Sequence, residues 1–114
     1  MPRGPERPPA RALLDLLGLA ARARAVTFGT DATRAAVRDG EARCVILAAD
    51  VSPTQAQKLV PLVQARGVPC FRCLTREEIG AAVGRASVSA VGFTQESFAR
   101  RAAELAAAIP SPQD

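Results

Sequence analysis

Histidine is absent from the 114 residues of this chain, and so are tryptophan and tyrosine. Without histidine the chain lacks the commonest general base, and with it the Ser–His and Cys–His pairs of nucleophilic enzymes. The sequence also contains no Walker-type phosphate loop and no glycine fingerprint of a dinucleotide-binding fold. We therefore expect a protein that is not an enzyme, with no cofactor and no small-molecule substrate.

Cysteine is scarce, and its three positions are Cys44, Cys70 and Cys73. A structural zinc site needs four nitrogen or sulfur ligands, which three cysteines and no histidine cannot supply. Cys70 and Cys73 form a Cys-x-x-Cys, but we expect both in one strand, where residues three apart point to opposite faces. We interpret all three as reduced, buried residues without a metal or redox role.

Long apolar runs are also missing, so no membrane-spanning segment is expected. Residues 1–9 hold four prolines and three charges, which is unlike a signal peptide, and we expect a cytoplasmic protein. This composition predicts a flexible N-terminal tail over residues 1–9 and a second tail over 110–114. Residues 10–109 then form a single domain.

Arginine carries almost all of the positive charge, because Lys58 is the only lysine among 15 basic residues. The formal net charge is +4 and the isoelectric point is about 9.8. The planar guanidinium fits phosphate groups and guanine edges, so a polyanionic partner is one explanation. A genome bias toward arginine and alanine explains the charge equally well, and composition alone does not separate the two.

Apolar residues alternate between helical spacing and short β-prone runs along the whole chain. Two capping boxes, at residues 52–55 and 75–78, predict the starts of helices, and Thr30 is expected to cap an earlier helix. Strands are expected at residues 26–28, 44–48, 70–74 and 88–93. Five helices alternating with four strands predict an α/β fold, a three-layer αβα sandwich with helices on both faces of a mixed sheet.

A series of short motifs resembles a known family. The series comprises residues 45–53 (Val-Ile-Leu-Ala-Ala-Asp-Val-Ser-Pro), 59–63, 67–69, Thr75-Arg76 and Ile79-Gly80-x-Ala82-x-Gly84. It resembles the L7Ae/L30e ribosomal protein family, and within it the bacterial YlxQ-type branch, from about residue 13 to residue 105. The resemblance implies an αβα sandwich that binds RNA kink-turns through the start of the second helix and nearby loops.

The kink-turn motif itself is only partly present. In the family's kink-turn binders the second helix opens with Gly-x-Asn-Glu, with a Lys three residues later, and these side chains contact guanines. Gly29 matches the glycine, but Asp31 stands in place of Asn, Ala32 in place of Glu, and Ala35 in place of Lys. A carboxylate accepts hydrogen bonds without donating them, and alanine does neither.

The resemblance and the local chemistry together give a set of candidate RNA-binding residues. A helix N-terminus suits phosphate, and four arginines, at positions 34, 38, 76 and 85, are expected at the same end of the sheet. The set is Gly29, Thr30, Asp31, Arg34, Arg38, Asp50, Val51, Ser52, Thr75, Arg76, Arg85, Ala86 and Ser87. Helix capping and solvated surface charge are the alternative explanations for these residue types.

Two functional hypotheses follow from these observations. The first is a non-catalytic ribonucleoprotein component that binds structured RNA, a kink-turn or an rRNA-like fold, in the context of the ribosome and translation. The chain has only four phenylalanines as aromatics, which favours recognition of shape and phosphates over base stacking. The second is a protein-interaction adaptor on the same fold that has lost kink-turn specificity.

Overall fold

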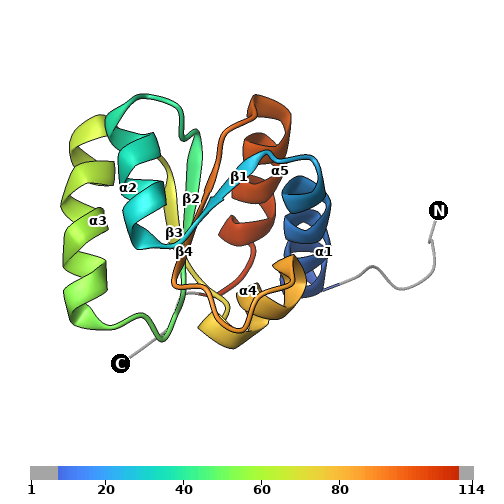
Figure 1. Cartoon of the computed structure of the whole chain (residues 1–114). Coiled ribbons are helices and arrows are strands. Elements are labelled where there is room, and N and C mark those ends of the chain that lie inside the picture. The colour runs from blue at the N-terminus through green and yellow to red at the C-terminus, as the bar shows by residue number, and fades with distance from the viewer. Residues whose placement is uncertain (1–7, 111–114) are drawn as a thin grey trace.

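The computed structural model describes residues 8–110 and contains five helices that alternate with four strands (Figure 1). The bounds are α1 (Pro9–Arg22), β1 (Val26–Phe28), α2 (Thr30–Arg38), β2 (Cys44–Leu47), α3 (Pro53–Arg66), β3 (Cys70–Arg72), α4 (Arg76–Val83), β4 (Ala90–Phe93) and α5 (Glu96–Ala107). The expected order of elements is confirmed. Of the two expected tails, residues 1–7 and 111–114 lie outside the described residues, and Pro9 already belongs to α1.

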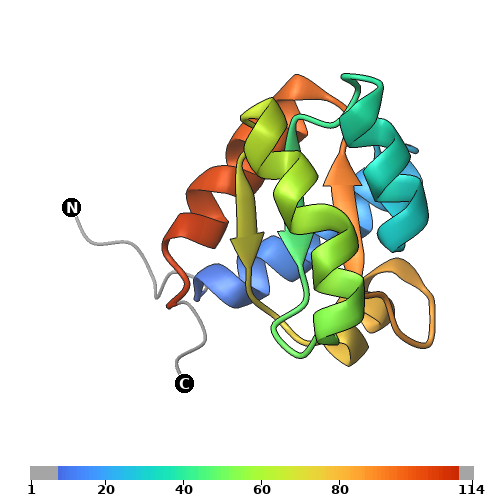
Figure 2. The same ribbon diagram turned by 90° about the vertical axis from the view of Figure 1, so that its left-hand side faces the viewer.

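The sheet is mixed, with the strand order β1-β4-β2-β3. Strand β4 pairs antiparallel with both β1 and β2, whereas β2 and β3 are parallel. Helices α2 and α3 cover one face, and α1, α4 and α5 cover the other (Figures 1 and 2). This arrangement confirms the three-layer αβα sandwich.

The central strands form the middle of the core. Every residue of β2 and β4 is buried, as expected for strands covered by helices on both faces. On α1 the buried residues are Leu13, Leu17 and Ala20, which share one helical stripe. Within the described part of the chain, no helix is long and apolar enough to cross a membrane.

Local sequence signals set the starts of α3 and α4, as predicted. The Ser52 hydroxyl accepts the Gln55 N–H, and Pro53 occupies the first position of α3. At α4 the capping box is complete, because Thr75 accepts the Glu78 N–H and the Glu78 carboxylate accepts the Thr75 N–H.

The predicted end of β3 is wrong, because the strand stops at Arg72 and not at residue 74. Leu74 has a left-handed φ of 66°, and its carbonyl accepts the Ala49 N–H at 2.6 Å. This bond ties the turn before α4 to the end of β2. Cys73 therefore lies outside the strand, and the argument that strand alternation separates it from Cys70 does not apply.

The cysteines are nevertheless core residues. Cys44 and Cys73 are buried, and burial raises the pKa of Cys44 to about 12 and that of Cys73 to about 11. Burial also raises the pKa of the partly buried Cys70 thiol. At neutral pH these thiols are protonated and poorly nucleophilic. Over residues 8–110, no group of three or more His, Cys, Asp or Glu side chains is placed to hold a metal ion.

Candidate nucleic-acid interface

Three helices begin at one edge of the sheet, which we call the site edge. Strands β1, β2 and β3 run in the same direction, because β4 is antiparallel to both of its neighbours. Each of these three strands is followed directly by a helix, so α2, α3 and α4 all start where the strands end (Figure 1). The positive dipole ends of all three helices therefore lie at this edge, and at the start of α2 no side chain caps the first-turn N–H groups.

The site edge brings together most of the predicted residues. It holds the start of α2 at Gly29 and Thr30, the segment before α3 at residues 50–52, and the start of α4 at Thr75 and Arg76. The loop between α4 and β4, residues 84–89, lies at the same edge because it leads into the first residue of β4.

A pocket of about 300 Å³ opens at the site edge. It is lined by Phe28, Gly29, Thr30, Gln55, Arg85, Ser87, Val88 and Ser89. The lining comes from the end of β1, the start of α2, the first turn of α3 and the α4–β4 loop. Four of these residues were predicted from the sequence, and four others, Phe28, Gln55, Val88 and Ser89, were missed because only the tertiary fold places them here.

The start of α2 is open, unlike the starts of α3 and α4. The cap residue is Gly29, with a φ of 91°, and no side chain caps the helix. The expectation that Thr30 is the cap is wrong, since Thr30 is the first helical residue. Its hydroxyl is buried and has no hydrogen-bond partner in the described part of the chain. Asp31 and Ala32 follow on the exposed surface, so the first turn of α2 is available to a ligand.

A small buried network holds α2 against the sheet. The Thr27 and Thr33 hydroxyl oxygens lie 2.9 Å apart, and the Gly92 N–H donates to Thr27 Oγ1 at 3.1 Å. A Cβ on Gly92 would lie 2.8 Å from the same oxygen, so a larger residue there would displace the Thr27 side chain. These contacts join α2, β1 and β4, and they position the first turn of α2.

Arg85 stacks over an aromatic ring. Its guanidinium carbon lies 4.2 Å from the centroid of the Phe28 ring, which is a cation–π contact. This contact holds the cation of the α4–β4 loop beside Gly29. Phe28 is the last residue of β1, so the ring marks the boundary between the sheet and the pocket.

Asp50 and Arg76 form a pair that links β2 to α4. The backbone N–H of Arg76 donates to Asp50 Oδ1 at 2.9 Å, and the side-chain Nε of Arg76 lies 3.5 Å from Asp50 Oδ2. The pKa of Asp50 is lowered, chiefly by the Arg76 N–H and further by the guanidinium. Arg76 thus contributes less net positive charge to the site edge than its sequence position indicates.

The other predicted arginines lie away from the pocket. Arg34 Nε donates to the carbonyl of Lys58 on α3 at 2.9 Å. Arg38 is the last residue of α2, about 12 Å along the helix from its start, and its carbonyl accepts a bond from Arg66. The expectation that Arg38 shares the site edge is therefore wrong. Arg72, which the sequence analysis missed, does lie there, because it ends β3 and bonds the Ala49 carbonyl.

The charge at the site edge is mixed. Arg72, Arg76 and Arg85 are its cations, whereas Asp31 and Asp50 are nearby anions, with two glutamates in the first turn of α4. Such an edge offers directed N–H and guanidinium donors, and not a broad positive field. It is suited to a polyanion whose phosphates meet these donors at defined positions.

The fold and the site edge together define the class of protein. It is a small αβα domain whose helix N-termini lie beside the loop between α4 and β4. The chain belongs to the Ribosomal protein L7Ae/L30e/S12e/Gadd45 family, whose sequence model matches residues 11–103. The resemblance noted in the sequence is thereby confirmed.

Relatives and solved structures agree with this assignment. The chain is 32% identical over 90 residues to RNA-binding protein YlxQ of Bacillus subtilis (strain 168), covering 79% of this chain and 90% of the relative. It is 30% identical over 92 residues to RNA-binding protein YlxQ of Enterococcus faecium, covering 81% and 88%.

Two solved structures show the same fold. A protein of unknown function from Bacillus halodurans C superimposes with a TM-score of 0.80 at 32% identity, over 83% of this chain and 96% of that chain. The Giardia lamblia 15.5kD RNA binding protein superimposes with a TM-score of 0.76 at 22% identity, over 90% of this chain and 88% of that chain.

Proposed function

We propose that this protein binds structured RNA through the site edge and catalyses no reaction. The observation that carries the proposal is that three helix N-termini lie at the same edge of the sheet as the α4–β4 loop, which carries Arg85. The start of α2 has no side-chain cap. Helix N-termini and guanidinium groups are suited to phosphate oxygens. The names of the two YlxQ relatives, which are RNA-binding proteins, support the same ligand class.

The ligand is a bent RNA, a kink-turn or an rRNA-like fold, in a cytoplasmic ribosome or translation context. The first turn of α2 presents Asp31 and Ala32 to solvent in place of the family's Asn and Glu. A carboxylate accepts hydrogen bonds from guanine N–H groups but cannot donate to guanine O6 or N7. We therefore expect shape and phosphate contacts to carry more of the affinity than base contacts.

The test is a binding titration by fluorescence anisotropy at several salt concentrations. The probes are a kink-turn hairpin and a fully paired hairpin of equal length. Because Arg85 lies in the pocket, Arg85→Gln is expected to weaken binding about 5- to 10-fold and to reduce the log–log salt slope by about 0.7–0.9. The matched control is Arg38→Gln, which makes the same charge change at the far end of α2 and should bind like the wild type.

Two results would count against the proposal. If the wild-type protein binds neither hairpin at about 50 mM salt, RNA binding is excluded and the adaptor hypothesis gains support. If Arg38→Gln weakens binding as much as Arg85→Gln does, the RNA contacts lie elsewhere than at the site edge.

A further inference from the structure

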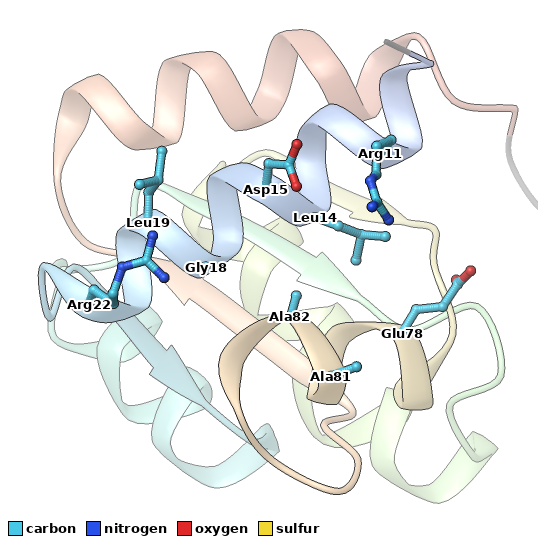
Figure 3. A pocket seen from close by; sticks show the side chains of 9 residues that line it. All are labelled: Arg11, Leu14, Asp15, Gly18, Leu19, Arg22, Glu78, Ala81 and Ala82. Atoms are coloured by element: carbon cyan, nitrogen blue, oxygen red, sulfur yellow. The ribbon is translucent and has the colours of Figure 1, made fainter.

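A groove runs between α1 and α4 on the face opposite α2 and α3. Two hollows, of about 760 Å³ and 680 Å³, share Gly18, Arg22, Ala81 and Ala82 among their lining residues and so form one continuous groove. Figure 3 shows the first hollow, with Arg11 toward one end, Arg22 at the other, and Ala82 of α4 pointing toward α1.

The second hollow, which we call the Arg22 groove, opens onto the site edge. It is lined by Gly18, Ala21, Arg22, Phe28, Ala81, Ala82, Val83, Gly84 and Arg85. Phe28 and Arg85 also line the pocket at the start of α2. The stacked Phe28–Arg85 pair is therefore the shared wall of the two depressions, and a ligand leaving the pocket passes directly into the Arg22 groove.

The charges in this groove have one sign. Among the described residues that line it, Arg22 and Arg85 are the only charged ones. Two acidic residues of α1 and α4, Asp15 and Glu78, line the first hollow but not the Arg22 groove. A chain that carries negative charge thus meets two guanidinium groups and no carboxylate between the site edge and Gly18.

The shape of the groove also suits a backbone more than a base. Its floor consists largely of glycine and alanine, which leave little side-chain bulk above the helices. The close packing of α1 on α4 fixes its depth, because a Cβ on Gly18 would lie 3.1 Å from the Ala82 carbonyl oxygen. A shallow floor flanked by arginines matches a sugar–phosphate chain, whose contacts are phosphate to guanidinium and sugar to small apolar residues.

We propose that the Arg22 groove binds the backbone of an RNA strand that continues from the site edge. The inference rests on the proposed function and deepens it, since it extends the contact from α2 across the α4–β4 loop to α1. The site edge engages the folded part of the RNA, and the Arg22 groove engages a flanking strand.

The experiment compares a minimal kink-turn hairpin with two versions that carry about six extra unpaired nucleotides at the 5′ or the 3′ end. We expect Arg22→Gln to weaken binding of one extended hairpin about 5-fold and to reduce its salt slope by about 0.7, with the minimal hairpin unaffected. The matched control is Arg43→Gln, because Arg43 is exposed and precedes β2 at the opposite edge of the sheet.

A second variant blocks the groove without touching an arginine. Ala81 is exposed on α4, so Ala81→Glu is compatible with the fold and introduces a negative charge over the groove floor. We expect it to weaken binding of the same extended hairpin as Arg22→Gln does.

The possible failures are distinguishable. If both groove variants bind the extended hairpins as Arg43→Gln does, while the wild type binds all three RNAs, this inference is overturned and the proposed function stands. If the wild type binds none of the three RNAs, the proposed function fails and the inference fails with it.

Discussion

Thr30 and Thr33 are both buried on α2, and they differ in whether the hydroxyl has a hydrogen-bond partner. We therefore expect a change to valine to have opposite effects on stability at the two positions. The Thr30 hydroxyl is buried without a partner, whereas Thr33 Oγ1 lies 2.9 Å from Thr27 Oγ1. An unpaired buried hydroxyl costs about 1–3 kcal/mol. We therefore expect Thr30→Val to raise the free energy of unfolding by about 1 kcal/mol, measured by urea denaturation.

Thr33→Val is the matched control. It removes a bonded hydroxyl of the same type from the same helix, and we expect it to lower the free energy of unfolding by about 1 kcal/mol. Equal destabilisation by both variants would show that the Thr30 hydroxyl is satisfied in solution. If Thr30→Val stabilises the protein and also weakens RNA binding, the protein tolerates an unpaired hydroxyl because the ligand uses it.

At Gly80 in the interior of α4, a change to alanine should lower stability, which is the reverse of its usual effect in a helix. Glycine in a helix interior normally costs about 1 kcal/mol relative to alanine. A Cβ on Gly80, however, would lie 2.8 Å from the carbonyl oxygens of Arg85 and Ala86, which belong to backbone. We expect Gly80→Ala to destabilise the protein by about 1–3 kcal/mol and, by displacing the Arg85 loop, to weaken RNA binding.

Ala81→Gly provides the comparison for that experiment. It changes the next residue of α4 in the opposite sense, at an exposed position, and should lower stability by about 1 kcal/mol with the affinity for the minimal kink-turn hairpin unchanged. If Gly80→Ala is instead stabilising, then α4 and the loop do not pack as closely in solution as in the structure.

Element boundaries were predictable where their cause is local. Ser52 and Thr75 each satisfy an N–H three residues away, and the sequence shows both partners, so the starts of α3 and α4 could be predicted. The end of β3 depends instead on a bond between Leu74 and Ala49, which are distant in the sequence. Such an end could not be predicted from local spacing.

At the scale of the whole molecule, the fold could be predicted from local signals, whereas part of the site depends on contacts between distant segments. Alternating apolar runs and caps predicted the αβα sandwich, and helix rise alone could have excluded Arg38 from the site edge. The stacking of Arg85 on Phe28 joins two segments that only the folded sheet brings together. The sequence therefore predicted that residues at the starts of helices would lie together, but not which residues of other segments would line the pocket beside them.

The stability of the whole molecule at alkaline pH should depend mainly on its cysteines. The chain has no histidine and no tyrosine, so the buried thiols dominate the change of stability with pH above pH 9. Burial raises the pKa of Cys44 from 9.0 to about 12 and that of Cys73 to about 11. Above pH 9 the unfolded chain loses these protons first, so the stability that they contribute is fully present at neutral pH. It should fall from about pH 9 up to about pH 11 for Cys73 and about pH 12 for Cys44, by up to about 1.4 kcal/mol per pH unit for each thiol. Urea denaturation from pH 7 to 10.5 with a reductant measures this fall, and Cys44→Ala should make its slope shallower even though the variant is less stable throughout. An unchanged slope in Cys44→Ala would mean that the Cys44 thiol does not govern alkaline unfolding.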